Sequence, residues 1–261
     1  MAFALDQFAL EGKVAIVTGA GARGNSIGRA YAFGLANAGA SILVADLDGD
    51  GAERVAIELR EAGYRARSTR VDISDPASAK AMAAAADAAF GGVDILVNNA
   101  AMMAELEYHP ASTVPIDYWN KVLAVNLTGA LNCAQAVLPL MRARSYGRIV
   151  NAVSGGAFPA QSVYGITKLA LVGLTTTLAT ELGRENITVN AIAPGNTMSE
   201  AGAGLTPPES PFKKKMEQMV VMRIEGQPDE LVGALILLAS PAGGWMTGQV
   251  LHVDGGWILR P

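Results

Sequence analysis

Short apolar runs alternate along this chain with longer stretches rich in alanine and leucine. The short runs have the length of β-strands and are bounded by polar or glycine-containing turns, whereas the longer stretches have the length and residue preferences of helices. The predicted strands are 13–18, 41–45, 66–71, 94–98, 147–153, 188–193 and 250–253. The predicted helices are 27–38, 51–62, 77–90, 116–142, 163–183 and 228–239. This alternation predicts an α/β protein with helices on both faces of a doubly wound parallel sheet of about seven strands.

Only the segment 196–227 breaks this rhythm. It contains Pro207-Pro208, Pro211, Lys213–Lys215, Met216, Met219 and Met222. Long irregular segments in compact α/β domains are commonly lids or disordered, and we expect a substrate lid here. The lysines form either a solvated face of the lid or an attraction for an anionic substrate. The methionines, spaced by three, predict either the buried face of a helix or the roof of a substrate pocket.

Composition and charge mainly exclude certain kinds of domain organisation, partner and crosslink. The 261 residues, 51% of them hydrophobic, contain no linker-like or charge-rich divider, so we expect one domain spanning 1–261. A net charge of −4 offers no broad attraction for nucleic acid or an anionic membrane. The single cysteine, Cys133, excludes an internal disulfide and favours the cytoplasm. The absence of a signal-peptide pattern and of a run of about 18 apolar residues favours a soluble protein.

A glycine-rich turn follows the first predicted strand and precedes the first predicted helix. It reads Thr18-Gly-Ala-Gly-Ala-Arg-Gly-Asn-Ser-Ile-Gly28. Glycines in this context let the backbone approach a pyrophosphate, which amides at the positive end of the helix hold. Ser26 is the expected N-cap of that helix. A glycine-rich turn alone is also compatible with a flexible loop, but strand, turn and helix together predict a dinucleotide site in a Rossmann-type sheet.

An acidic residue ends the second predicted strand. This residue, Asp46, stands 18 positions beyond Gly28, where a carboxylate accepts hydrogen bonds from an adenosine ribose and repels a 2′-phosphate. The pattern therefore predicts NAD, with NADP as the less favoured cofactor. Two alternatives stay open. Asp46 simply begins the turn Asp-Leu-Asp-Gly, or Arg23 in the glycine turn pairs with a phosphate, which is either the 2′-phosphate or the pyrophosphate.

Tyr164 and Lys168 stand four residues apart in a stretch of small and apolar residues. On a helix this spacing places both side chains on one face. A free tyrosine keeps its proton up to about pH 10, and a neighbouring ammonium lowers that pKa, which makes the phenol a usable base near neutrality. A solvated helix surface contains the same pair by chance, so the surrounding motifs decide its meaning.

Further motifs follow in a fixed order. They are Asp72-Ile73, Asn98-Asn99-Ala100-Ala101, Val125-Asn126-Leu127, Asn151-Ala-Val-Ser154, Pro194-Gly195 and Thr247-Gly-Gln-Val-Leu-His-Val-Asp-Gly-Gly256. Together with the glycine turn and the Tyr–Lys pair, they make the chain resemble the short-chain dehydrogenase/reductase family in its single-domain form. The resemblance covers essentially the whole chain.

The resemblance implies a catalytic tetrad of Asn126, Ser154, Tyr164 and Lys168. Tyr164 would transfer a proton to or from the substrate oxygen, and Ser154 would hydrogen-bond that oxygen. Lys168 would lower the tyrosine pKa and bind the nicotinamide ribose, and Asn126 would bend its helix and hold a water. The implied cofactor contacts are Gly19, Arg23, Ser26, Ile27, Asp46, Leu47, Asp72, Ile73, Asn99, Ala100, Tyr164, Lys168, Pro194, Gly195 and Thr197.

Three departures from the family pattern concern this site. The glycine turn is about three residues longer than usual, with Ser26 near the place of the middle glycine, as in the related enoyl reductases. Ala101 replaces a glycine, and we expect its extra methyl to be tolerated. The interval from Ser154 to Tyr164 is 10 residues, shorter than usual, which is expected to reshape the rim around 155–158.

The favoured function is therefore that of an NAD-dependent oxidoreductase that acts on CH–OH groups and interconverts a secondary alcohol and a ketone. Apolar residues at the rim and lid favour a medium-sized apolar substrate; they are Met102, Met103, Phe158, Met198 and Phe212. An enoyl reductase and a catalytically silent NAD-binding sensor or scaffold are the alternatives.

Assembly and metal content complete the expectations. The resemblance implies a homotetramer that packs through the helices around Asn126 and Tyr164. No metal is expected, because His109 and His252 have no nearby cysteine or acidic cluster at ligand spacing. Cys133, in an apolar helix, is expected in the core.

Overall fold

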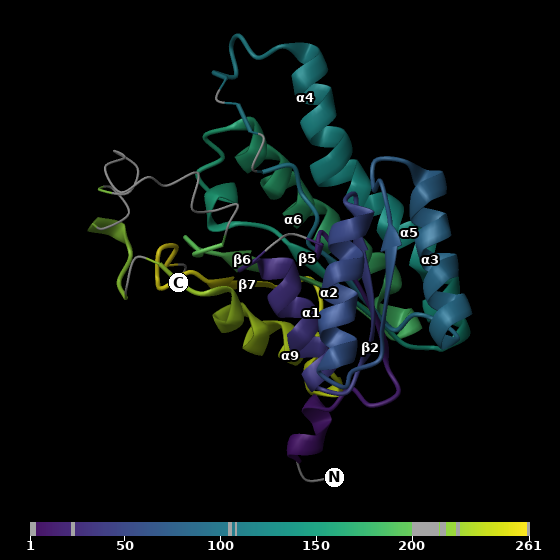
Figure 1. Ribbon diagram of the computed structural model, residues 1–261. Coiled ribbons are helices and arrows are strands. Elements are labelled where there is room, and N and C mark those ends of the chain that lie inside the picture. The colour runs from purple at the N-terminus through teal and green to yellow at the C-terminus, as the bar shows by residue number, and fades with distance from the viewer. Residues whose placement is uncertain are drawn as a thin grey trace.

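The centre of the molecule is one parallel sheet of seven strands in the order β3-β2-β1-β4-β5-β6-β7 (Figure 1). The computed structural model describes residues 4–21, 24–103, 106–107, 109–199, 214, 218–222 and 225–259. The strands are β1 Val14–Thr18, β2 Ser41–Asp46, β3 Ala66–Arg70, β4 Ile95–Asn98, β5 Gly147–Ala152, β6 Ile187–Pro194 and β7 Val250–Val253. The predicted doubly wound α/β sheet is confirmed, and each predicted strand boundary falls within one residue of the observed one.

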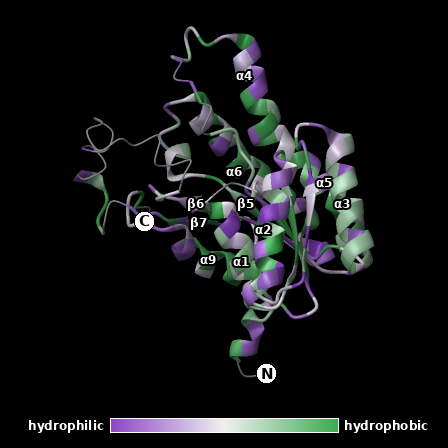
Figure 2. Ribbon diagram, viewed as in Figure 1, coloured by the Kyte–Doolittle hydropathy of each residue, from purple (hydrophilic) through white to green (hydrophobic). Residues whose placement is uncertain are grey.

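Helices cover both faces of the sheet because the strand residues are apolar on both sides. Val17 and Val44 belong to the core under α1 Ile27–Asn37, α2 Gly49–Glu61 and α9 Val232–Ala239. Ile16 and Leu43 belong to the core under α3 Pro76–Phe90, α5 Gly129–Ala143 and α6 Val163–Leu182. Helix α2 carries both hydrophilic and hydrophobic residues along its length, as Figure 2 shows, because only one of its faces reaches the sheet.

The chain leaves β1 toward β2 on one side and reaches β4 on the other side of β1. In an open α/β sheet this reversal opens a crevice at the carboxyl ends of the strands, where ligands bind. The carboxyl ends of β1, β4, β5 and β6 carry the motifs that the sequence analysis singled out. The topology therefore gathers those motifs at one edge of the sheet.

The helix expected over 116–142 is interrupted at its middle. It consists of α4 Ile116–Leu123, the π-helical turn η2 Ala124–Thr128 and α5. The N–H of Gly129 donates to the C=O of Ala124, five residues back, so the turn is wider than an α-helical turn. The turn carries Asn126, which is buried. The expectation of one regular helix was wrong at this point, and the wide turn agrees with the implied bend at Asn126.

The segment 196–227 begins and ends at the same place. Thr197 and Gly226 form a parallel bridge, and the Met198 N–H donates to the Gly226 C=O over 2.8 Å. Met219 and Met222 are 42% and 73% exposed, so the predicted buried helix face was wrong for these two methionines. Met216, Lys213, Lys215 and Phe212 lie outside the described residues.

Candidate active site

The glycine turn packs tightly on the ends of β1 and β4. Gly19 has a φ of +68°, and a Cβ on it would lie 2.6 Å from Cα of Ala100. A Cβ on Gly28 would lie 2.2 Å from the C=O oxygen of Gly19. These two glycines are thus required by the close approach of backbone to backbone, which holds the turn against the sheet.

Thr18 and Asn99 join the turn to β4. The Thr18 Oγ1 accepts the N–H groups of Asn99 and Ala100, both over 3.1 Å. The Asn99 side chain donates in return to the C=O groups of Thr18 and Gly19, over 3.0 and 2.9 Å. Asn99 and Ala100 thereby border the crevice, as predicted. Thr18 was not among the predicted site residues, although a threonine between a strand and a glycine turn was a visible signal.

Helix α1 points its positive end at the same crevice. Ser26 is its N-cap, as predicted, and its Oγ accepts the N–H of Arg29 over 3.2 Å. Helix geometry leaves the N–H groups of Ile27 and Gly28 without acceptors inside the helix. Two free amides at a helix N-terminus, behind a glycine turn, fit a pyrophosphate. The Ser26 hydroxyl thus acts as a helix cap. Arg23 lies outside the described residues.

Asp46 lies at the end of β2, facing the glycine turn. Its Oδ2 accepts the N–H of Gly21 over 2.8 Å, and its Oδ1 accepts the N–H of Asp48 over 3.0 Å. The carboxylate therefore both orders the turn that follows β2 and keeps lone pairs for ribose hydroxyls. Next to it, the Nε of Arg70 donates to the C=O of Leu47 over 3.2 Å. Arg70 is a cation beside the implied adenosine site that the sequence analysis missed.

Two further implied contacts lie around the neighbouring loop. Asp72 at the end of β3 accepts the N–H and hydroxyl of Ser74 over 2.9 and 2.6 Å, so its carboxylate holds its own loop. Ile73 is buried at 7% exposure, and its C=O accepts the Asn132 amide over 2.9 Å. These bonds hold the loop against α5 at the border of the crevice.

The third loop of the crevice follows β6. A Cβ on Gly195 would lie 2.6 Å from Cα of Asp254, so only glycine fits after Pro194. Thr197 is buried at 8% exposure and donates to the C=O of Gly195 over 3.2 Å. The structure thus brings Gly195 and Thr197 to the same strand end as the predicted catalytic residues. A cavity of about 240 Å³ lies beneath them, with Gly226, Gln227 and Gly255 in its wall.

Ser154 and Tyr164 meet in the crevice despite the short interval between them. Ser154 lies just beyond β5 and caps the short turn η3 Gly155–Ala157, where its Oγ accepts the N–H of Gly156 over 3.1 Å. Tyr164 lies in the first turn of α6, and its side chain is hydrogen-bonded to Ser154. The phenol oxygen also lies 3.9 Å from the sulfur of Met103. A hydroxyl pair beside an apolar rim residue is suited to bind one substrate oxygen.

Lys168 lies one helical turn beyond Tyr164 and is 2% exposed. Its Nζ donates to the C=O of Ala152 over 2.6 Å and lies 5.6 Å from the centre of the Tyr164 ring. The backbone carbonyl at the end of β5 thus fixes the ammonium under the phenol. The predicted pairing of the two residues on one helix face is confirmed.

The pKa values of the pair differ from the expectation. Burial raises the pKa of Tyr164 to about 12, and the hydrogen bond from Ser154 is what opposes this rise. Burial lowers the pKa of Lys168 to about 8. Burial of the phenol is the cause of the raised pKa, and the expectation that Lys168 lowers the tyrosine pKa stays a prediction for the cofactor-bound enzyme. The phenol therefore keeps its proton throughout the neutral range.

Asn126 connects the catalytic helices to the rim. Its Oδ1 accepts the N–H of Met102 over 2.7 Å, and its Nδ2 donates to the C=O of the same residue over 3.2 Å. The same Nδ2 lies 3.3 Å from Oγ1 of Thr167, which donates to the C=O of Tyr164 over 2.7 Å. The wide turn η2 directs the Asn126 amide at the rim residue Met102 and at α6 together. Thr167 is another residue that the sequence analysis missed, although it shares the helix face of Tyr164.

Of the remaining candidates, Cys133 lies in the core and Leu47 at the surface. Cys133 is fully buried in the core, as predicted, and burial raises its pKa to about 12. Leu47 is 58% exposed beside the implied adenosine site. Within the described part of the chain, no three His, Cys, Asp or Glu side chains come together at metal-binding spacing.

Comparison with known proteins identifies the family. The family model described as enoyl-(acyl carrier protein) reductase matches residues 21–258. An uncharacterized oxidoreductase of Mycobacterium tuberculosis is 46% identical over 250 residues, which cover 96% of this chain and 99% of the relative. The chain belongs to the short-chain dehydrogenase/reductase family. The resemblance inferred from the motifs is therefore confirmed.

Solved structures of short-chain dehydrogenases agree with the whole fold. A gluconate 5-dehydrogenase from Burkholderia cenocepacia, in complex with NADP and tartrate, has a TM-score of 0.90 at 36% identity and 98% coverage of both chains. A 7α-hydroxysteroid dehydrogenase, complexed with NADH and 7-oxo glycochenodeoxycholic acid, has a TM-score of 0.91 at 35% identity and 99% coverage of both chains. This short-chain dehydrogenase/reductase is accordingly an oxidoreductase with a nicotinamide cofactor.

Proposed function

We propose that the enzyme is an NAD-dependent dehydrogenase that interconverts a secondary alcohol and a ketone, with residues 1–261 acting as one catalytic domain. The hydrogen-bonded pair of Ser154 and Tyr164 above the fixed ammonium of Lys168 carries this proposal. The nicotinamide supplies or accepts the hydride. Related enzymes act on alcohol and ketone groups, namely a gluconate and a hydroxysteroid.

The protein's own part in the reaction is proton transfer and positioning. The Tyr164 phenol, protonated at neutral pH because burial raises its pKa, donates its proton to the carbonyl oxygen during ketone reduction. The Ser154 hydroxyl holds that oxygen. Lys168, held by Ala152, stabilises the phenolate that remains, and Asn126 keeps the rim beside it in place. In alcohol oxidation the same groups act in reverse.

An enoyl reductase is the second candidate, and two observations favour it. The matching family model carries that description, and the glycine turn is lengthened with Ser26 at its end. The four-residue spacing of Tyr164 and Lys168 favours the dehydrogenase instead. A panel of secondary alcohols, ketones and enoyl thioesters, followed by nicotinamide absorbance, decides between them. Binding of NADH without turnover of any member would support the silent sensor or scaffold.

The first testable consequence is a preference for NAD over NADP of at least about tenfold in kcat/KM, or about 1.4 kcal/mol. A 2′-phosphate beside Asp46 would combine charge repulsion with loss of the ribose hydrogen bonds. Steady-state kinetics with both cofactors measure the preference. Asp46→Ser should narrow it, and Arg70→Ala, which removes the nearby cation, should weaken only NADP use. Equal kcat/KM values for the two cofactors in the unaltered enzyme would contradict the assignment.

The second consequence concerns a medium-sized apolar substrate under a lid at 196–227. Met103 touches the catalytic phenol, and Met198 is 39% exposed beside the crevice. Both ends of the lid are tied to the glycine turn, because the Asn25 amide donates to the Met198 C=O over 2.7 Å and to the Gln227 side chain over 3.4 Å. Asn25 was not among the predicted site residues, since nothing in the sequence pairs it with residues about 170–200 positions away.

Matched apolar and carboxylated secondary alcohols test the substrate class. We expect the apolar series to have the higher kcat/KM, and hydrogen exchange across 196–227 to slow when NAD and substrate are both present. Asn25→Ala should weaken that protection, whereas Asn37→Ala, on the outer end of α1, should not. A kcat/KM more than tenfold higher for the carboxylated series would contradict the apolar pocket. It would favour attraction of an anionic substrate by Lys213–Lys215 instead.

The third consequence is a soluble cytoplasmic homotetramer. Two helical stretches, Ile116–Ala143 and Val163–Glu185, are long and apolar enough to cross a membrane by length and composition, with 44% of their most apolar windows buried in one chain. They pack on the sheet through α5 and α6, so their uncovered apolar surface is available to other copies. Light scattering should give about 108 kDa, four times the 27.0 kDa of one chain. A monodisperse 27.0 kDa species at micromolar concentration would contradict this.

A further inference from the structure

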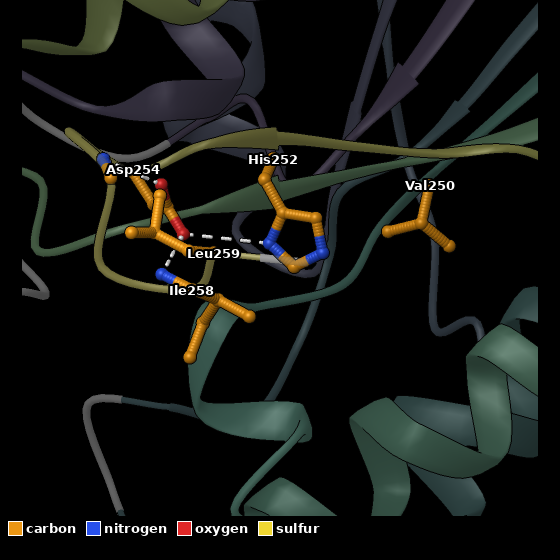
Figure 3. A pocket seen from close by; sticks show the side chains of 6 residues that line it. Val250, His252, Asp254, Ile258 and Leu259 are labelled. Atoms are coloured by element: carbon orange, nitrogen blue, oxygen red, sulfur yellow. Dashed lines mark hydrogen bonds and ion pairs between the residues drawn. The ribbon is translucent and has the colours of Figure 1, made fainter. Parts of the chain in front are cut away.

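The motif Thr247–Gly256 has no part in the chemistry proposed above. It contains β7, which is the last strand of the sheet and pairs with β6, where His252 lies opposite Ala193. Alternation along the strand turns Val250 and His252 to the same face, toward the core of α6. Figure 3 shows these two side chains beside an open hollow that is also lined by Ile258 and Leu259.

Two side chains lie against the imidazole of His252. Its ring centre lies 4.7 Å from that of Phe158, with the planes tilted by 41°. Its Nδ1 lies 3.4 Å from Oδ2 of Asp254, as Figure 3 shows. Only 16% of the His252 side chain and 4% of the Asp254 side chain are exposed. The imidazole therefore bridges the C-terminal strand and the segment that follows catalytic Ser154.

Asp254 holds the turn that follows β7. Its Oδ1 accepts the N–H of Gly256 over 3.0 Å, and its Oδ2 accepts the N–H of Ile258 over 2.9 Å. The turn also touches the catalytic side directly, because a Cβ on Gly155 would lie 2.6 Å from the ring of Trp257. The end of the chain from β7 onward thus contacts the segment that follows Ser154 at two points. Trp257 lies against Gly155, and His252 lies against Phe158.

We propose that His252 is a positioning residue of the active site, which acts through Phe158. Together with Asp254 it holds the turn 155–158, and this turn orients the Ser154 hydroxyl through the N–H of Gly156. Displacement of the turn would move that hydroxyl relative to Tyr164, with which it is hydrogen-bonded. The inference rests on the proposed function, because Ser154 and Tyr164 are the reacting pair there.

Hydrogen exchange tests the positioning without substrate or cofactor. In His252→Ala, amides of 155–158 should exchange at least about tenfold faster, while amides of α1 keep their rates. His252→Phe, which keeps a ring against Phe158 but loses the partner of Asp254, should show a smaller increase. His109→Ala, which removes the other histidine, should leave 155–158 unchanged. Unaltered exchange of 155–158 in His252→Ala would overturn the proposal.

Kinetics with an alcohol that the unaltered enzyme oxidises separate positioning from simple support of the fold. In His252→Ala, kcat should fall about tenfold, at the upper end of what an aromatic pair contributes. The NADH dissociation constant, measured by fluorescence titration, should stay within about twofold. His252→Phe should recover most of kcat. Faster exchange with unchanged kcat would overturn the proposal, whereas failure of the unaltered enzyme to oxidise any alcohol would overturn the proposed function alone.

Discussion

Tyr164→Phe is expected to lower turnover by about 10²–10⁴-fold and to leave NADH affinity within a few-fold of the unaltered enzyme. The substitution keeps the ring beside Met103 and Lys168 but removes the hydroxyl that is hydrogen-bonded to Ser154. Steady-state kinetics in both directions and a fluorescence titration with NADH measure the two effects. Tyr118→Phe is the matched control, since the Tyr118 hydroxyl bonds the backbone of Glu107, away from the Ser154 hydroxyl. Retention of a tenth of the activity in Tyr164→Phe would contradict the acid–base role.

The pH dependence of the unaltered enzyme checks the same role. Because the pKa of Tyr164 is raised to about 12, ketone reduction, which uses the protonated phenol, should not change between about pH 6 and 8. Alcohol oxidation, which uses the phenolate, should rise about tenfold per pH unit over that range. A plateau of oxidation below pH 8 would show that the pKa of the phenol falls when the cofactor is bound. In that case the original expectation from the Tyr–Lys spacing would hold for the loaded enzyme.

Much of the fold was predictable because strand periodicity and turn residues agree along this chain. Apart from the polar β3, each β-strand of the sheet lies where a short apolar run stands between turn residues, as for Val14–Thr18 after Gly12. The π-helical turn around Asn126 was not predictable, because the same pattern of apolar residues is compatible with an α-helical and with a π-helical turn. The early start of α2 at Gly49 was missed because it depends on one side-chain bond, from the N–H of Gly51 to Asp48.

The residues that form the site were largely predictable from the sequence, but their pKa values were not. Parallel strands end at one edge, so motifs that follow strands must meet, and Ser154, Tyr164 and Lys168 do so. Spacing on a helix shows which side chains are neighbours, whereas pKa values depend on burial by distant segments. Contacts such as that between Asn25 and Met198 join residues 173 positions apart and have no local sequence signal. For this reason Asn25 emerged only from the structure. Thr167 and Arg70 lie beside predicted site residues but were not predicted.

Lys168→Met is expected to abolish turnover and, unlike most active-site substitutions, to stabilise the folded protein at neutral pH. A lysine pKa of about 8 in place of 10.5 corresponds to about 3 kcal/mol of destabilisation wherever the folded protein holds a charged Lys168. Methionine has a similar length and no charge. The lost hydrogen bond to Ala152 offsets about 1 kcal/mol of the gain. The expected net gain is about 2 kcal/mol at pH 7, or a rise in Tm of about 4–8 °C.

The sign of the pH dependence makes this prediction specific. Below pH 8 both folded and unfolded states hold the proton of Lys168, so the buried charge destabilises the folded unaltered enzyme by the full amount. Between pH 8 and 10.5 only the unfolded state holds this proton, so the stability of the unaltered enzyme rises with pH and the advantage of Lys168→Met disappears.

Thermal unfolding measures this convergence of the two proteins at pH 7, 9 and 10.5, at one protein concentration and without cofactor. Lys121→Met, an exposed change on α4, is the control and should show no such trend. A Tm for Lys168→Met below that of the unaltered enzyme at pH 7 would mean that Lys168 is charged there without penalty, and that its fixed position under Tyr164 is favourable even before the cofactor binds.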